Sequence, residues 1–279
     1  MNLRDASTNL PAGRIPALVR ITGIFLPVAT LAIFLMAPAR TRQPYIPPQQ
    51  DQAAAHDMHD MADMPGMDHS AAAPAETPQE IAKHSADKRE SEFNHNLAGA
   101  LVIVAALFFL AEGSLTKRWP ALRFAWPLCF LAAGLFVLLL SDTEIWPFGY
   151  QSFYFAITHD PEVAQHKAFA LILLALGMVE AFRVSGKWKA AWSAWVFPVI
   201  GLGGALLLLF HHHGGMHGPD AMQTMQRVKH QHLEFAWVGA GAALTKGLAD
   251  SYAKWRPVFN RVWPLLMIFL GVLLLLYKE

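Results

Sequence analysis

The chain has 279 residues, of which 54% are hydrophobic and only 15% are charged, and its formal net charge is +1. A soluble domain carries about 25% charged residues, so the composition excludes an ordinary soluble globular protein. No basic stripe with interleaved aromatic residues is present, which argues against nucleic-acid binding. Cys129 is the single cysteine and lies in an apolar run. This excludes a disulfide framework and a thiolate metal cluster, and favours a membrane-buried hydrophobe.

Residues 1–39 have the pattern of a signal peptide or a signal anchor. Three arginines in the first twenty residues precede an apolar segment over residues 21–36. Residues 37–39, Ala-Pro-Ala, offer an A-x-A-like end for cleavage, while the long basic stretch fits an uncleaved anchor equally well. Both alternatives place residue 40 onward outside the cytoplasm.

Residues 40–92 are rich in Ala, Pro, Gln and Asp and contain few large aliphatic side chains. Such a segment cannot bury enough apolar surface to fold alone, so we predict a disordered tail. Within fifteen residues it carries seven imidazole or thioether side chains, namely His56, Met58, His59, Met61, Met64, Met67 and His69. Tracts of this kind typically bind metal, although a low-complexity spacer is the alternative. Thioethers favour Cu(I), and imidazole and carboxylate accept Cu(II).

The rest of the chain, residues 93–279, has the pattern of an all-α integral membrane domain. Six apolar runs of about twenty residues are each long enough to cross a bilayer, and we expect spans at 94–115, 121–141, 162–183, 191–211, 228–249 and 258–277. Lys and Arg concentrate in the short connections, whereas the long loops after the second and fourth spans carry few or none. The positive-inside rule therefore places the short connections in the cytoplasm and the long loops outside.

The six spans form three related hairpins, at 94–141, 162–211 and 228–277. Each hairpin begins with a histidine near the external end of its first helix: His95, His166 and His232. An aromatic residue followed by proline comes 31 residues later in each, at Trp126-Pro127, Phe197-Pro198 and Trp263-Pro264, and a glycine follows at Gly134, Gly204 and Gly271. Identical spacing in all three predicts a threefold repeat. We expect the proline to kink each second helix.

The three repeated histidines are the first candidate metal site. If the first helices of the hairpins line a common centre, His95, His166 and His232 converge on a three-coordinate site for copper, or for zinc with an open fourth position. The alternative is three separate interfacial histidines bonded at the headgroups. Polar residues at membrane depth are usually functional, which favours the metal. His159 also lies on the external side, just before the third span, and is included as a possible ligand.

The external loop from His211 to His232 is the second concentration of ligands. It contains His211, His212, His213, Met216, His217, Met222, Met225, His230 and His232. Met222, Met225 and His232 fall near one helical stripe, which indicates either packing or a relay of soft sites toward the membrane. His230 lies on another face and pairs with Glu234. The His211–His213 run alternatively interacts with a helix dipole.

Charged residues deep in the spans indicate structural ion pairs first and an ion path second. Glu180 and Lys246 lie fourteen residues after His166 and His232, roughly 21 Å further along their helices. Glu112 has a similar depth. No catalytic triad order, HExxH helix, Walker loop or dinucleotide fingerprint is present, so we expect no enzymatic activity and no catalytic residues.

With its Met/His tail, one-sided histidines and helical hairpins, the chain resembles the copper-resistance protein D (CopD/PcoD) family of bacterial inner-membrane proteins. The segment DMPGMDHS, residues 63–70, is similar to copper-binding segments of copper-resistance systems. The resemblance implies copper homeostasis in the bacterial cytoplasmic membrane, with the metal-binding tail and loops in the periplasm and periplasmic copper carriers as partners.

Two functions from different classes follow. The first is a non-enzymatic membrane protein that binds Cu(I), Cu(II) or both, for periplasmic capture, resistance or transport, with zinc a poorer fit. The second is a haem-b protein that exchanges electrons with quinone. Stacked haems need axial histidines toward both membrane faces, and this chain has histidines toward one face, so only an external haem would be ligated.

Overall fold

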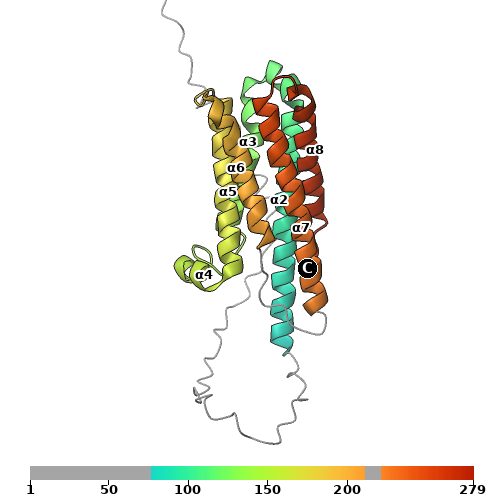
Figure 1. The fold of residues 1–279 in the computed structure, drawn as a ribbon. Helices are drawn as coiled ribbons and strands as arrows, with labels where there is room; N and C mark the ends of the chain where they lie inside the picture. The colour runs from blue at the N-terminus through green and yellow to red at the C-terminus, as the bar shows by residue number, and fades with distance from the viewer. Residues whose placement is uncertain (1–76, 211–220) are drawn as a thin grey trace, which may run out of the picture. The chain divides into compact units, whose positions relative to one another are not determined.

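The computed structural model describes residues 77–210 and 221–279, and these form a helical bundle (Figure 1). The elements in chain order are α2 (Pro78–Arg118), a 3-10 turn η1 (Pro120–Phe124), α3 (Ala125–Leu139), the short α4 (Phe153–His159), α5 (Pro161–Val184), a second 3-10 turn η2 (Ala191–Trp195), α6 (Val196–Leu209), α7 (Ala221–Ser251) and α8 (Arg256–Leu275). The all-helical class is confirmed, and every expected span is a helix.

Helix α2 begins well before the expected span. It starts at Pro78, so residues 78–92, which the sequence assigned to the disordered tail, are helical. Proline suits the first turn of a helix because its missing N–H has no partner to lose there. The stretch that follows is rich in Ala, Glu, Gln and Lys, all strong helix formers. Local propensity therefore extends the helix beyond its apolar part.

The repeated prolines act differently from the expected mid-helix kink in two of the three hairpins. Pro127 and Pro198 each lie in the first turn of an α-helix that follows a 3-10 turn. The absent proline N–H removes no hydrogen bond at that position. Only Pro264 lies inside its helix, α8, as predicted. In the first two hairpins a change of helix type thus takes the place of the kink.

Close contacts at glycines bring α2 against α8 and α3 against α5. A Cβ atom built on Gly99 of α2 would lie 2.6 Å from the carbonyl oxygen of Gly271 in α8. On the other side, a Cβ atom on Gly134 of α3 would lie 2.7 Å from the Leu174 side chain of α5. Small residues let membrane helices approach closely. Since α5 packs on α6, α6 on α7 and α7 on α8, these contacts close the helices into a ring.

A second structural repeat accompanies the first. The residue before each repeated histidine is an amide, and its side chain donates to the main-chain carbonyl that ends its own hairpin: Asn94 to Ser141 (2.9 Å), Gln165 to Phe210 (2.9 Å) and Gln231 to Lys278 (2.8 Å). The carbonyls at a helix C-terminus have no intrahelical partner. The amides thus cap the three hairpins in the same way, which supports the predicted threefold repeat.

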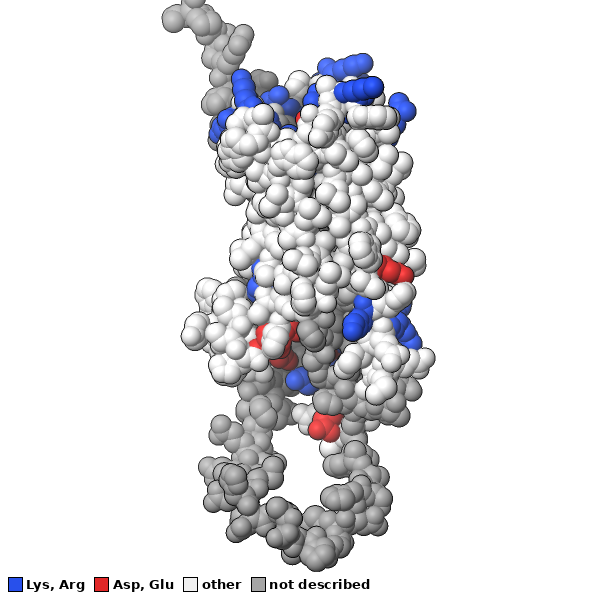
Figure 2. All heavy atoms as spheres, viewed as in Figure 1, with Lys and Arg blue, Asp and Glu red and all other residues white. Residues whose placement is uncertain are grey.

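Four helical segments are long and apolar enough to cross a membrane: Pro78–Arg118, Pro120–Leu139, Ala191–Leu209 and Arg256–Leu275. This is the pattern of a multi-pass membrane protein. At the end of the bundle where the helices of each hairpin are connected, the charged side chains of the face shown are nearly all Lys and Arg (Figure 2). The opposite end carries charges of both signs, and the middle between them is uncharged. We call the first the basic end, and the opposite end, where α4 lies, the histidine end.

Candidate metal-binding cavity

A cavity of about 250 Å³ lies between the helices and is reached by all three repeated histidines. His95 comes from α2, His166 from α5 and His232 from α7. Asp160 is the N-cap of α5: it accepts hydrogen bonds from the backbone N–H groups of Glu162 and Val163 and so fixes the start of that helix. The first helices of the hairpins therefore line a common centre, as the repeat predicted.

In two of the imidazoles, the same local hydrogen bond determines which ring nitrogen carries the hydrogen. Nδ1 of His95 lies 2.9 Å from the Ser91 carbonyl oxygen, and Nδ1 of His232 lies 2.8 Å from that of Val228. A carbonyl only accepts, so Nδ1 must carry the hydrogen and Nε2 the lone pair of the neutral ring. Second-sphere bonds of this kind orient metal-binding histidines. Both rings therefore have the tautomer that ligates through Nε2.

His95 and His232 lie edge to face within an aromatic cluster. Their ring centroids are 5.7 Å apart, and Tyr277 stacks on His95 at 3.8 Å. Phe235 lies 5.5 Å from His232 and 6.4 Å from His95. His232 is 4% exposed and Tyr277 is fully buried. The two imidazoles are thus held in fixed orientations by packing, which lowers the entropy lost when a ligand binds.

The wall of the cavity beside His95 adds further polar atoms. The Asn94 side chain donates to the Ser141 carbonyl, and its Oδ1 is buried without a hydrogen-bond partner among the described residues. Lys167 is buried and bonds the Val137 carbonyl, the Ser141 hydroxyl and the Asp142 carboxylate. The ammonium is neutralised by that carboxylate. Asn94 therefore presents an unused acceptor at the histidine end.

The rest of the cavity is apolar and partly aromatic. Val102, Leu176, Ala242 and Met267 line it, together with Phe130 and Phe197, whose ring centroids are 6.0 Å apart. Next to them the repeat residues Trp126 and Trp263 pack at 5.6 Å between ring centroids. A buried apolar pocket with a few polar groups at one end is the usual form of a ligand site.

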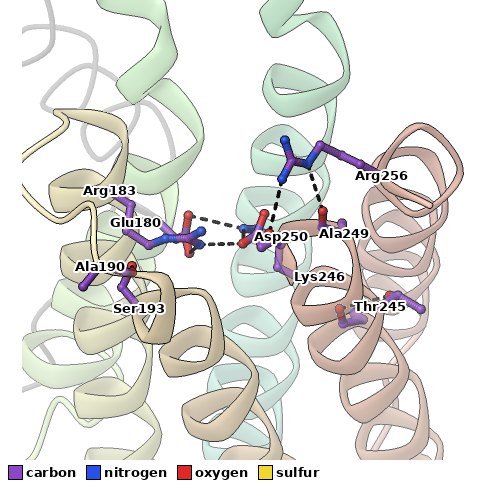
Figure 3. Close-up of polar contacts among 10 residues, drawn as sticks. Glu180, Arg183, Ala190, Ser193, Thr245, Lys246, Ala249, Asp250 and Arg256 are labelled. Atoms are coloured by element: carbon purple, nitrogen blue, oxygen red, sulfur yellow. Dashed lines mark hydrogen bonds and ion pairs between the residues drawn. The ribbon is translucent and has the colours of Figure 1, made fainter. Parts of the chain in front are cut away.

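A charged cluster follows further along α5 and α7, and Figure 3 shows its side chains. Arg183 bonds both Glu180 (2.7 Å) and Asp250 (2.5 Å), and Lys246 bonds the same two carboxylates, at 3.4 Å and 2.5 Å. Two cations and two anions thus neutralise each other. The predicted ion pair between Glu180 and Lys246 is confirmed. Arg183 and Asp250, which the sequence did not predict as partners, complete the cluster.

The remaining predicted ligands that the structure describes do not join the cavity. His159 lies on α4, is exposed, and stacks on Phe155 at 4.1 Å between ring centroids. Met222 and Met225, in the first turns of α7, are 74% and 49% exposed. His230 pairs with Glu234 at 3.3 Å on the surface of α7, as predicted. The predicted stripe from these methionines to His232 is therefore not a continuous row of buried side chains.

Within residues 77–210 and 221–279, no group of three His, Cys, Asp or Glu side chains is close enough to hold one metal ion. His95, His166 and His232 thus share a cavity but are not assembled into a preformed coordination set. The other predicted ligands lie outside the described residues, namely His56, Met58, His59, Met61, Met64, Met67, His69, His211, His212, His213, Met216 and His217.

In the comparison with known proteins, no family model, no curated protein and no solved structure matches the chain. The function is therefore inferred from the sequence and the structure.

Five residues that contribute to the histidine end were missed from the sequence. The amides Asn94, Gln165 and Gln231 precede the repeated histidines, so a longer comparison of the repeats would have found them. Lys167 follows His166 directly, but its partner Asp142 lies in the preceding loop. Tyr277 had no signal of this kind, because its stacking on His95 depends on how α8 ends against α2.

Proposed function

We propose that the protein binds copper at the periplasmic face of the bacterial cytoplasmic membrane, through the cavity reached by His95, His166 and His232. The observation that carries the proposal is the convergence of these repeat-equivalent imidazoles on one cavity. Imidazole binds copper in either oxidation state, and the thioethers of the N-terminal segment bind Cu(I). The protein acts without catalysis, in copper capture and resistance, as the resemblance to the CopD family implies.

The proposal includes six membrane spans rather than four. Helices α5 and α7 carry Lys167, Glu180 and Lys246 within the expected spans, but these side chains are buried and paired within the bundle. Charged residues at membrane depth usually face the bundle interior in pairs. The outward faces are apolar, since Leu171 is 61% and Trp237 is 71% exposed. A lipid bilayer therefore suits all six long helices.

The orientation follows from the distribution of charge. Cytoplasmic loops of membrane proteins are enriched in Lys and Arg, which assigns the basic end to the cytoplasm. The histidine end then faces the periplasm, together with the exposed aromatic residues Trp146, Phe148 and Tyr154 of the loop around α4. Trp and Tyr are typical of the membrane interface. Copper therefore reaches the cavity from the periplasmic side.

The ligands divide into two roles. The Met/His segment of residues 56–69 and the histidines of residues 211–217 collect copper from the periplasm or from its carriers. The pair His95 and His232 receives it, since a main-chain carbonyl fixes Nδ1 of each ring, and His166 completes the set. A three-coordinate imidazole site of this kind suits copper.

The test is copper titration of the purified protein in detergent, in parallel with two variants. One variant lacks residues 51–70, and the other carries His95→Ala, His166→Ala and His232→Ala together. We expect the deletion to lower the number of copper ions bound and the triple variant to remove the tightest remaining site. A stoichiometry and affinity unchanged by both variants would refute the proposal.

The same preparations test the haem alternative. A reduced-minus-oxidised haem signal in the absorbance spectrum of the wild-type protein, lost in the triple variant, would replace copper binding by electron transfer. Competition with zinc tests whether zinc is bound instead of copper, because a copper site of imidazole ligands follows the order in which Cu²⁺ binds more tightly than Zn²⁺.

A further inference from the structure

Lys246 occupies an unusual position at the junction of the three repeats. Its Nζ lies 5.7 Å from the ring centroid of Trp126, 5.6 Å from that of Phe197 and 5.6 Å from that of Trp263. These aromatic residues are repeat-equivalent, one from each hairpin, 31 residues after its histidine. The ammonium thus lies at nearly equal distances from the three rings, close to the axis that relates the hairpins.

Three aromatic rings and two carboxylates together form a cation-binding environment. Ammonium ions within about 6 Å of an aromatic centroid are attracted by the ring quadrupole, more strongly when water is excluded. The Lys246 side chain is 3% exposed, and it also bonds Glu180 and Asp250. The cation in this site is therefore supplied by the chain itself.

Charge balance explains why this site excludes a second cation. Glu180 and Asp250 carry two negative charges, and Arg183 and Lys246 carry two positive charges, in four mutual contacts (Figure 3). Arg256 adds hydrogen bonds to the carbonyls of Ala249 and Asp250 on the same side. Glu112 also interacts with Lys246, and Arg123 lies near enough to balance it. A copper ion that entered the cluster would therefore meet no net negative charge and would lose its own ligands.

We propose that these side chains form a cation-binding site on the repeat axis that Lys246 keeps occupied, so that the bundle is closed to copper and other cations at its basic end. Copper bound in the cavity then returns to the periplasm or to a carrier and does not cross the membrane. The copper part of this inference rests on the proposed function, whereas the closure applies to any cation.

The test uses the full-length protein in liposomes loaded with K⁺, and efflux is followed with an ion-selective electrode. We expect wild-type liposomes to lose K⁺ no faster than protein-free liposomes, and Lys246→Ala to raise the rate at least tenfold. Lys246→Met fills the volume without charge and separates a steric plug from an electrostatic one. Lys246→Arg retains the charge and should stay tight.

Propylammonium supplies the missing part of the side chain in Lys246→Ala. We expect it to slow the K⁺ efflux of this variant in a saturable manner, with no effect of n-propanol at the same concentration. A wild-type protein that conducts K⁺ or Cu(I) above the protein-free rate would overturn the inference. A folded Lys246→Ala protein that stays as tight as wild type would overturn it equally.

Lys246→Met covers the case in which Lys246→Ala does not fold, because it fills the volume of the side chain. It leaves Glu180 and Asp250 with Arg183 alone, so a folded Lys246→Met protein as tight as wild type would indicate a steric plug and contradict the cation site. Copper titration of the same wild-type preparation separates the two proposals. Failure of copper binding refutes the proposed function alone, because K⁺ efflux reports on closure independently of copper.

Discussion

The histidine end and the basic end of the bundle both place polar side chains among apolar helices, but they satisfy them differently. At the basic end, Glu180, Arg183, Lys246 and Asp250 each contact two oppositely charged partners from the same chain. At the histidine end, imidazoles border a cavity, and Asn94 Oδ1 is buried without a partner among the described residues. The first arrangement is complete within the chain, and the second offers atoms to a ligand.

This difference indicates which end of the bundle can bind and release a ligand. Removing one member of a closed charge cluster leaves a buried charge uncompensated, which is costly. Removing an imidazole from the wall of a cavity leaves a slightly larger cavity and no unpaired charge. Stability should therefore depend mainly on the basic end, and ligand binding mainly on the histidine end.

The largest expected effect is loss of stability in Glu180→Gln. The substitution leaves Lys246 and Arg183 sharing Asp250 alone, and breaking a buried pair from one side costs about 3–5 kcal/mol. The matched control is Glu234→Gln, since the Glu234 side chain is 44% exposed and pairs with His230 on the surface. Thermal unfolding in detergent measures both, and equal melting temperatures for the two variants would remove the distinction between the ends.

Charge-balanced replacement sharpens that result. In the double variant Glu180→Gln, Lys246→Met the remaining Arg183 and Asp250 still pair at 2.5 Å. We expect the double variant to unfold at a higher temperature than Glu180→Gln, because neighbouring residues of one network are not additive. A double variant with the summed loss of the two single variants would show that packing, rather than charge balance, stabilises the basic end.

The next effect concerns copper affinity and compares two histidines of one helix. His232→Ala removes a ligand whose Nδ1 is fixed by Val228 and whose ring lines the cavity. Loss of groups that merely orient a ligand already costs 10–100-fold in metal affinity, so we expect a weakening of about 100-fold. His230→Ala, two residues away and 72% exposed in its side chain, should leave the cavity site unchanged. Copper titration of protein lacking residues 51–70 removes the ligands of the N-terminal segment from the measurement, and equal affinities in the two variants would exclude His232 as a ligand.

An intermediate effect tests whether the contact between α2 and α8 closes the ring of helices. A Cβ atom on Gly99 would lie 2.6 Å from the backbone of Gly271, whereas one on Gly113, in the same helix, meets nothing within 4 Å. Overpacking costs about 1–3 kcal/mol, so Gly99→Ala should lower the melting temperature. Gly113→Ala should leave it unchanged or raise it, since Ala favours helix over Gly by up to about 1 kcal/mol. Equal responses would mean that α2 and α8 are not in contact.

The sequence predicted those features that repeat with a fixed period. The apolar runs located the helices, and the equal spacing of His95, His166 and His232 indicated that they share one centre. The 3-10 turns before Pro127 and Pro198 could not be foreseen, because hydropathy does not distinguish helix types. The four-residue charge cluster could be predicted only in part, since Asp250 and Arg183 lie at helix ends where solvent exposure is the usual expectation.

The smallest effects concern the amide caps. They test whether caps of equivalent geometry in different hairpins also contribute equally to the free energy of unfolding. Gln231 makes two bonds with Lys278, donating to its carbonyl at 2.8 Å and accepting from its N–H at 3.0 Å, and Gln165 donates to the Phe210 carbonyl at 2.9 Å. One hydrogen bond contributes about 0.5–1.5 kcal/mol net. Gln231→Ala and Gln165→Ala should therefore each lower the melting temperature slightly. The third hairpin also places Tyr277 on His95, so its cap orders the wall of the cavity, and Gln231→Ala should weaken copper binding slightly where Gln165→Ala does not. A larger loss of affinity in Gln165→Ala would instead make the second hairpin, through His166, the one that determines the geometry of the site.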